Sequence, residues 1–245
     1  MRSAGVRRRG GGLIVSTRRC ATRFSPRVQF ASSTFSDWIV FLSRTCVTTG
    51  GIILCGGRSS RMRRSKALLP FGDETMLQRI VRLMRSVVRP IVVVAAPRQR
   101  LPILPADVLI TRDAIEDQGP LQGFLAGLEM LPDEVDAVYL SSCDVPLLQP
   151  GFIQRMVDLL GEHAIAMPQV ADRRHPLTAV YRREVIEPIK QLLKTQRRRL
   201  LDLAERCPTR FVEPAELFHV DRDLRSLRNV NTPEDYADVL RSLIG

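Results

Sequence analysis

Hydrophobic and polar positions follow two different periods from residue 50 onward. Short, nearly continuous apolar runs are typical of strands buried on both faces of a parallel sheet. Four such runs occur, at 52–55, 91–95, 108–111 and 137–141. Apolar residues at helical spacing predict a helix over 77–88, capped by Asp73 or Thr75, and helices over 120–131 and 150–160 that begin with proline. Strands that alternate with helices in this way predict an α/β fold.

The last third of the chain has a weaker pattern. It predicts strands over 164–166, 178–181 and 211–213 and helices over 184–194, 198–206 and 233–243. With no internal repeat or low-complexity block after residue 50, the pattern predicts a single domain. We expect a mostly parallel, Rossmann-like sheet with helices on both faces, in three layers.

The beginning of the chain has a different composition. Residues 1–49 contain nine arginines and a single acid, Asp37, with many Ser and Thr residues. Such a segment is typical of a transit peptide or of a disordered arm. We favour a third interpretation, in which Val47 marks the start of translation from a GTG codon. In each case too few apolar residues are present to offset the ordering entropy, so we expect a disordered extension over 1–46 and a catalytic domain over 47–245.

The charge of the chain is unevenly distributed. The 245 residues carry a net charge of +11, which ordinarily suggests nucleic acid or a membrane surface as a partner. Residues 1–49 contribute +8 of it, so the predicted domain is nearly balanced and nucleic acid is an unexpected partner. The longest apolar run before residue 50, 38–42, is too short to span a membrane. Five cysteines without a C-x-x-C pair disfavour a disulfide framework and structural zinc, so we expect a cytoplasmic protein.

The candidate chemistry lies in the loop after the first strand, LCGGRSSRMRRSKALL at 54–69. Open α/β sheets bind ligands at this place. Gly56 and Gly57 let backbone N–H groups approach a phosphate or a base edge, while Arg58, Arg61 and Lys66 offer positive charge to a polyphosphate. The spacing fits neither G-x-x-x-x-G-K-[ST] nor G-x-G-x-x-G, which disfavours P-loop NTPases and dinucleotide dehydrogenases. An ordinary Gly/Ser/Arg surface loop is the alternative interpretation.

Six blocks, in order, resemble the molybdenum cofactor guanylyltransferases, a bacterial family with the nucleotidyltransferase fold. They are LCGGRSSRM with KALLPFG within 54–72, RD at 112–113, GPLQG at 119–123, SCDVP at 142–146, RHPL at 174–177 and NVNTPED at 229–235. The resemblance covers residues 50–245 and implies a three-layer nucleotidyltransferase domain. Arg63 and Ser65 depart from it, because the family usually has glycine and aspartate there, and Ala95 stands where some members have asparagine.

The resemblance implies transfer of GMP from GTP to molybdenum-loaded molybdopterin, with release of pyrophosphate and with Mg²⁺ as cofactor. Because the attacking phosphate monoester is already ionised near neutral pH, no histidine base is needed. Lys66, with Arg61 in support, would stabilise the transferring phosphoryl group, and Asp144 would bind Mg²⁺. The implied nucleotide-binding residues are Leu54, Cys55, Gly56, Gly57, Lys66, Asp113 and Asp144.

Partners and rival functions follow from the same residues. The resemblance implies a monomeric enzyme that receives its pterin from other cofactor biosynthesis proteins. A sister enzyme that uses CTP, or that activates a sugar or alcohol phosphate, is one alternative; Gly56 with Gly57 favours guanine, since cytidylyl relatives tend to have alanine first. A non-catalytic nucleotide- or nucleic-acid-binding protein is the other, suggested by Arg63, Ser65 and the basic extension and disfavoured by the retention of Lys66 and Asp144.

Overall fold

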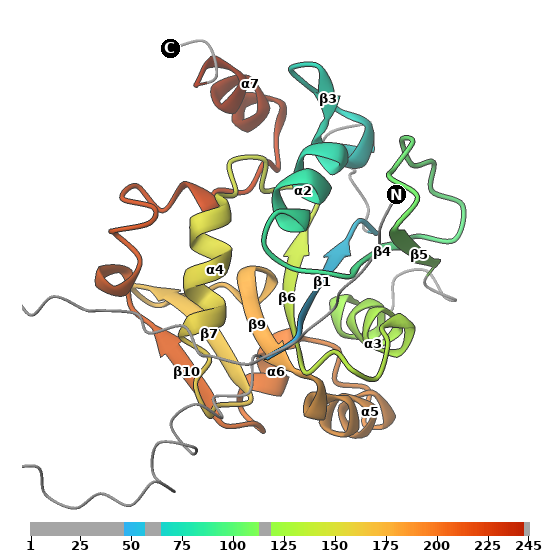
Figure 1. Cartoon of the computed structure of the whole chain (residues 1–245), viewed down its shortest axis with the longest axis vertical. Helices are drawn as coiled ribbons and strands as arrows, with labels where there is room; N and C mark the ends of the chain where they lie inside the picture. The colour runs from blue at the N-terminus through green and yellow to red at the C-terminus, as the bar shows by residue number, and fades with distance from the viewer. Residues whose placement is uncertain (1–46, 57–64, 113–118, 243–245) are drawn as a thin grey trace, which may run out of the picture. The chain divides into compact units, whose positions relative to one another are not determined.

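A mixed β-sheet forms the centre of the molecule (Figure 1). The computed structural model describes residues 47–56, 65–112 and 119–242, and the predicted extension over 1–46 lies outside them. Within the described residues the strand order across the sheet is β10-β7-β9-β6-β1-β4-β5, and β8 pairs with β7. In that order the strands are Thr209–Val212, Ile165–Val170, Ala179–Arg182, Ala137–Ser142, Thr49–Leu54, Ile91–Ala95 and Val108–Arg112, with β8 at Arg173–Arg174.

The sheet is mostly parallel, as the apolar runs predict. Strands β6, β1, β4 and β5 are parallel to one another, and β10 is parallel to β7. Every residue of β4 and β6 is buried, which explains why these segments are apolar without alternation. Only β9, among the strands of the main order, runs antiparallel to both of its neighbours, β6 and β7. This reversal divides the sheet into a parallel half, β6-β1-β4-β5, and a mixed half, β9-β7-β10.

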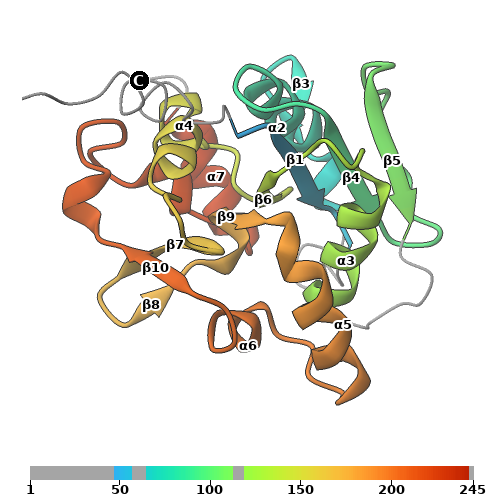
Figure 2. The same cartoon turned by 60° about the horizontal axis from the view of Figure 1, so that its bottom comes forward.

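Helices cover both faces of the sheet, and Figure 2 shows the strands in a row between the two helical layers. Buried side chains of α2 and α4 form one core with one face of the strands, and those of α3, α5 and α6 form a second core with the other face. The three-layer prediction is therefore confirmed. The helices are α2 (Met76–Arg85), α3 (Pro120–Met130), α4 (Pro150–Asp158), α5 (Ile186–Lys194), α6 (Leu200–Ala204) and α7 (Pro233–Arg241).

The signals that start the helices act as the sequence predicts. Of the two candidate caps for α2, Thr75 is the cap: its hydroxyl accepts a hydrogen bond from the Gln78 backbone N–H, and the Gln78 side chain accepts one from Thr75 N at 2.8 Å. Helices α3 and α4 begin with Pro120 and Pro150. These starts fix where the preceding loops leave the sheet.

Three local features differ from the sequence prediction. The pairing of β2 (Pro70–Phe71) with β3 (Glu74–Thr75) was not predicted, because strands of two residues are too short to show a period. Strand β7 continues past residue 166, since its last residues pair with β8. Helix α6 is shorter than 198–206, because the Asp202 carboxylate accepts a hydrogen bond from Arg199 N and the helix starts at Leu200. The arginines 197–199 therefore precede the helix.

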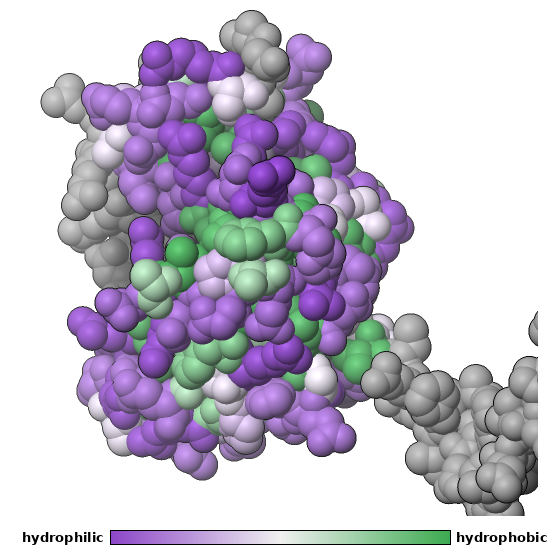
Figure 3. Space-filling model, turned by 90° about the vertical axis from the view of Figure 1, so that its left-hand side faces the viewer, coloured by the Kyte–Doolittle hydropathy of each residue, from purple (hydrophilic) through white to green (hydrophobic). Residues whose placement is uncertain are grey.

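The surface has few large apolar side chains. The side of the molecule drawn in Figure 3 is mainly hydrophilic, with small apolar areas between polar residues. None of the helices in the described part of the chain has both the length and the hydropathy that crossing a bilayer requires. The polar side chains of the candidate site lie at one edge of the sheet, where the parallel strands β1 and β6 end.

Candidate active site

Two neighbouring parallel strands end together at the candidate site. Leu54 at the end of β1 is in register with Ser142 at the end of β6. One further hydrogen bond, from Cys143 N to Leu54 O at 3.2 Å, holds the chain together just beyond the strands. Asp144 comes next, so this carboxylate stands at the carboxyl edge of the sheet, where open α/β folds bind ligands.

Lys66 joins Asp144 to the C-terminal segment. Lys66 belongs to a short 3-10 helix, Lys66–Leu68, whose Ala67 is fully buried. Its Nζ donates to Asp144 Oδ2 at 3.0 Å and to Asn231 Oδ1 at 2.9 Å. The side chains of Lys66 and Asp144 are only 14% and 15% exposed. Asp144 and Asn231 lie 78 and 165 positions after Lys66 in the sequence, and both bind its ammonium group.

Asp144 is held on two further sides. The Ser142 hydroxyl donates to Asp144 Oδ1 at 2.5 Å. The Asp144 carbonyl accepts a hydrogen bond from Val230 N at 2.8 Å, which brings the next residue, Asn231, to the same place. The resulting cluster of Ser142, Asp144, Lys66 and Asn231 is called the site cluster below. It combines one positive charge, one negative charge and two neutral oxygens at the rim of the sheet.

Gln99 holds both ends of the glycine-led loop, and sequence reasoning missed it. Its Nε2 donates to Cys55 O at 3.0 Å and to Ser65 Oγ at 3.3 Å, while its Oε1 accepts from Ala96 N at 3.0 Å. Ser65, which departs from the family pattern, therefore has a structural partner on the loop after β4. A glutamine in a loop gives no pattern in one sequence, so only the fold reveals this contact.

The two cysteines beside the site are buried side chains. Cys55 and Cys143 follow β1 and β6 and are 5% and 6% exposed. A hydrogen bond with Cys143, burial and the negative charge of Asp144 together raise the pKa of the Cys55 thiol well above its ordinary value. A thiol that stays protonated is a poor nucleophile, which favours a packing role for these cysteines over covalent catalysis.

The glycines near the site have different reasons for being glycine. A side chain added at Gly56 would meet nothing closer than Ala96 N at 3.6 Å, which is an ordinary contact, so the described residues leave this position open. Gly119, the N-cap of α3, has φ +82° and its added Cβ would lie 3.2 Å from Arg198. Gly123 faces Leu54 and Val94 on the sheet. Backbone conformation and packing thus account for Gly119, whereas the nearest atoms to an added Cβ at Gly56 and at Gly123, both at 3.6 Å, leave room for it.

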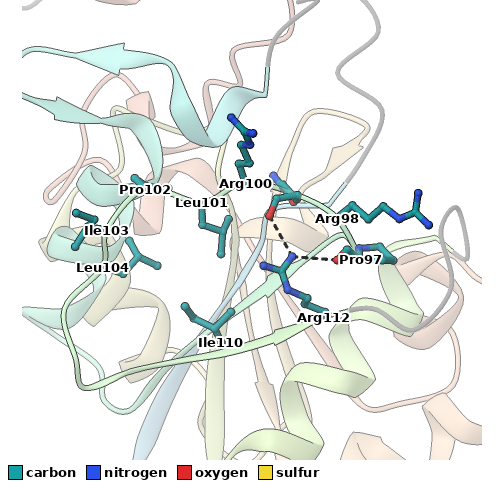
Figure 4. A pocket seen from close by; sticks show the side chains of 10 residues that line it. Pro97, Arg98, Arg100, Leu101, Pro102, Ile103, Leu104, Ile110 and Arg112 are labelled. Carbon is teal, nitrogen blue, oxygen red and sulfur yellow. Dashed lines mark hydrogen bonds between the residues drawn. The ribbon is translucent and has the colours of Figure 1, made fainter.

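An open hollow of about 760 Å³ lies beside the loop that carries Gln99 (Figure 4). Arg112 at the end of β5 points into this loop and donates through Nη1 to the carbonyls of Ala96 at 2.9 Å, Pro97 at 3.3 Å and Gln99 at 3.1 Å. The arginine therefore organises the loop backbone. The exposed Ile103 and Ile110 make the other wall of the hollow apolar.

The structure brings most of the predicted site residues to one edge. Leu54 ends β1 there, Cys55 and Gly56 follow it, and Lys66 and Asp144 are in direct contact. Four predicted residues, Gly57, Arg58, Arg61 and Asp113, lie outside the described residues. Sequence analysis alone left open the role of Asn231, which the structure shows bound to Lys66.

The donors of the site cluster fit a magnesium ion. Asp144 offers a carboxylate, and Asn231 and Ser142 offer neutral oxygens, all hard ligands of the kind that Mg²⁺ prefers. The position of Lys66 Nζ between Asp144 Oδ2 and Asn231 Oδ1 shows that these oxygens converge on a cation. Within the described ranges no group of three His, Cys, Asp or Glu side chains could form a protein-only metal site. One carboxylate completed by substrate oxygens is a common arrangement for Mg²⁺.

Comparison with known proteins identifies the family. The model of the MobA-like NTP transferase domain matches residues 51–209, which include β6, most of β1, Lys66 and Asp144. The chain belongs to the MobA-like NTP transferase family. Its enzymes are nucleotidyltransferases, which agrees with the nucleotidyltransferase resemblance of the sequence blocks.

Individual relatives agree with this assignment. A "Probable molybdenum cofactor guanylyltransferase" of Bacillus cytotoxicus is 30% identical over 197 residues, covering 79% of this chain and 96% of the relative. One of the same name from Methanosarcina acetivorans is 29% identical over 206 residues, covering 79% and 91%. Among solved structures, molybdopterin-guanine dinucleotide biosynthesis protein A of Archaeoglobus fulgidus has a TM-score of 0.67 at 17% identity, covering 80% of this chain and 98% of that one. The last likeness confirms the nucleotidyltransferase fold.

Proposed function

We propose that this member of the family transfers GMP from GTP to molybdenum-loaded molybdopterin and releases pyrophosphate. The observation that carries the proposal is the convergence of Lys66, Asp144 and Asn231 at the carboxyl ends of β1 and β6. The names of relatives that are about 30% identical over nearly their full length support guanylyl transfer in particular.

Lys66 acts in this proposal as the cation that receives the phosphates. In the transfer, an oxygen of the pterin's terminal phosphate forms a bond to the α-phosphorus of GTP, and the bond from that phosphorus to the bridging oxygen of pyrophosphate breaks. Negative charge shifts toward the leaving pyrophosphate during this step. An ammonium group that is already held at the rim of the site stabilises this charge without having to be reorganised.

Asp144 and the oxygens of Asn231 and Ser142 are the residues that would hold Mg²⁺. When bound, the ion supplies charge neutralisation for the triphosphate. Ser142 donates to Asp144 Oδ1, which fixes the carboxylate and leaves its second oxygen, Oδ2, toward Lys66.

The site cluster contains no histidine, and the reaction needs no general base. The attacking group is a phosphate monoester, which is largely dianionic near neutral pH. Binding and orientation of two anionic substrates are then the main tasks of the protein. Gly56, open on its outer side, suits a close approach of the nucleotide to the backbone, and Gly57, Arg61 and Asp113 remain predicted contacts. Delivery of the pterin by other biosynthesis proteins, a monomeric state and a cytoplasmic location also remain predictions.

The test measures pyrophosphate release by the full chain with Mg²⁺ and molybdenum-loaded molybdopterin, with GTP, CTP and ATP supplied separately. The variants are Lys66→Ala and Asp144→Asn, and Lys194→Ala on α5 is the matched control for loss of a lysine. We expect turnover with GTP alone, its loss in both site variants, and unchanged turnover in the control.

Other results would change the assignment in defined ways. Preference for CTP would move the protein to a cytidylyl-transferring activity on the same fold. Turnover with GTP that survives in Lys66→Ala and Asp144→Asn would place the reaction elsewhere. Lack of turnover with all three nucleotides, in a protein that is folded by circular dichroism, would contradict the proposed acceptor.

A further inference from the structure

The start of α7 is attached directly to the site cluster. The Asp235 carboxylate accepts hydrogen bonds through Oδ2 from the backbone N–H groups of Asn231 at 2.9 Å and Thr232 at 3.0 Å. Thr232 Oγ1 in turn accepts from Asp235 N at 3.1 Å, which completes the helix cap. Only the contact to Asn231 N goes beyond what a cap requires, and Asn231 is the residue that binds Lys66.

The orientation of Asn231 is fixed from both sides. On one side Val230 N donates to the Asp144 carbonyl at 2.8 Å. On the other side Asp235 holds Thr232 N, and it also holds Asn231 N. Asn231 itself is exposed, and its amide oxygen accepts from Lys66. The backbone contacts at its two ends are therefore what determines where Asn231 Oδ1 meets Lys66.

Helix α7 also packs against the segment that follows Lys66. Val230 and Val239 form a small core with Leu69, Phe71 and Met76, and Figure 1 shows α7 beside the β2–β3 hairpin. The Tyr236 hydroxyl donates to the Pro70 carbonyl. The helix thus spans from the Lys66 segment to the Asp144 segment, and the cap at Asp235 is its end nearest the cluster.

We propose that Asp235 is a positioning residue for the transfer reaction: by holding the Asn231 backbone, it keeps Asn231 Oδ1 on Lys66 Nζ and so places the ammonium group for the phosphates. The inference rests on the proposed function for its kinetic consequence. Its structural content, that Asp235 controls Lys66 through Asn231, stands independently.

The kinetic test is a double-mutant cycle in the full chain. Asp235→Ala and Asn231→Ala are each expected to lower kcat for pyrophosphate release about tenfold, with little change in the KM for GTP, because a small displacement of Lys66 weakens stabilisation of the transition state. The double variant should be no slower than Asn231→Ala alone, since both changes act on one path. Asp235→Glu, which restores a carboxylate at the third helical position, should recover most of the rate.

Thr232→Ala separates positioning from helix stability. This variant removes the other half of the cap and lowers the melting temperature, yet it leaves the Asp235 contact to Asn231 N in place. We expect its kcat to stay near that of the unmodified chain at a temperature where both are folded. Equal loss of kcat in Thr232→Ala and Asp235→Ala would overturn the proposal, as would additive losses in the cycle.

A second readout needs no turnover. Acylation of Lys66 by acetic anhydride, followed by mass spectrometry with Lys190 and Lys194 as internal references, reports how firmly the amine is held. Faster labelling of Lys66 in Asp235→Ala but not in Thr232→Ala supports the positioning role, and unchanged labelling in both contradicts it. If the unmodified chain fails to release pyrophosphate while the labelling difference is found, the proposed function fails and the inference about Asp235 survives.

Discussion

Two polar clusters connect the C-terminal segment to the sheet, and they are built in opposite ways. In the site cluster, Asp144 receives its hydrogen bonds from the side chains of Lys66 and Ser142. In the second cluster, which lies at the start of α4 and is called the anchor cluster, Asp221 accepts from the backbone of Arg225 at 3.0 Å and of Ser226 at 2.7 Å. The first carboxylate is bound by groups that can move, the second mainly by backbone.

Burial separates the two clusters further. Asp221 is 2% exposed and Ser226 is fully buried, and Gln149 contributes both its side chain, to Asp221 Oδ1 at 3.0 Å, and its backbone N–H, to Ser226 Oγ at 3.0 Å. Both carboxylate oxygens of Asp221 thus accept hydrogen bonds, and each accepts one from a backbone N–H group. The Lys66 and Asp144 side chains keep some access to solvent. A carboxylate held by backbone N–H groups stabilises a turn, whereas one held by a long side chain at a rim is available to a ligand.

The largest expected effect is on activity, from Asp144→Asn. The amide oxygen still accepts from Lys66, and the new NH₂ group faces a serine hydroxyl that accepts as readily as it donates, so the folded structure keeps its hydrogen bonds. The substitution, however, removes the carboxylate that we propose as the Mg²⁺ ligand. We expect pyrophosphate release to fall by roughly 10²–10³-fold, with the melting temperature nearly unchanged.

The same substitution in the anchor cluster, Asp221→Asn, should give the reverse result. In this variant the new NH₂ group must face at least one of the N–H groups that donate to the Asp221 carboxylate in the unmodified chain. Two hydrogen-bond donors then face each other in a buried place. We expect a loss of about 3 kcal/mol in the free energy of unfolding. Thermal denaturation should show it as a fall on the order of 10 °C, while kcat below the transition is preserved.

The exposed neighbour Asp223 provides the control, because Asp223→Asn removes the same charge two residues away. A loss of activity in Asp221→Asn at a temperature where the protein is folded would break the distinction between the clusters. So would a large drop in melting temperature in Asp144→Asn.

The comparison also shows which parts of the fold a single sequence predicts. In the parallel half, strands buried on both faces are long apolar runs, so their positions and those of α2, α3 and α4 follow directly from the pattern. The mixed half and the segment after residue 213 depend on tertiary contacts. The pairing of β7 with β8 and the turn held by Asp221 have no periodic signal, because each involves only a few residues and their hydrogen bonds come from the backbone.

The site shows the same limit. Glycines, a lysine and an aspartate at the ends of buried strands have a recognisable spacing, so Gly56, Lys66 and Asp144 were predicted. Gln99 and the contact between Asn231 and Lys66 were missed or left open, since 34 positions separate Gln99 from Ser65 and 165 separate Lys66 from Asn231. These residues come together only when the sheet is assembled and α7 packs beside it.

A smaller effect is expected from Tyr139→Phe beside the anchor cluster. Tyr139 is fully buried on β6, and its hydroxyl has no hydrogen-bond partner among the described residues. Burial, and then the negative charge of Asp221, raise the pKa of this hydroxyl far above its ordinary value, so it stays neutral. Removing an unpaired hydroxyl costs no hydrogen bond, so the free energy of unfolding should rise or change by less than about 1 kcal/mol. A loss of several kcal/mol in urea denaturation would show that the anchor cluster includes Tyr139.

The smallest expected effect is on the melting temperature at acid pH, and it tests how Asp235 links α7 to the site cluster. Because hydrogen bonds from Asn231 N and Thr232 N hold the pKa of Asp235 below its ordinary value, its ionised form stabilises the folded state. That contribution is complete above the unfolded pKa of about 3.9 and is lost as the pH falls through the lower pKa of the folded state. Asp235→Asn should therefore melt below the unmodified chain at pH 7, and the difference should shrink as the pH is lowered below about 4. Glu234→Gln, at the other acid of the first helical turn, is the control. A difference that stays constant from pH 7 to pH 3 would mean that the charge of Asp235 does not anchor the start of α7.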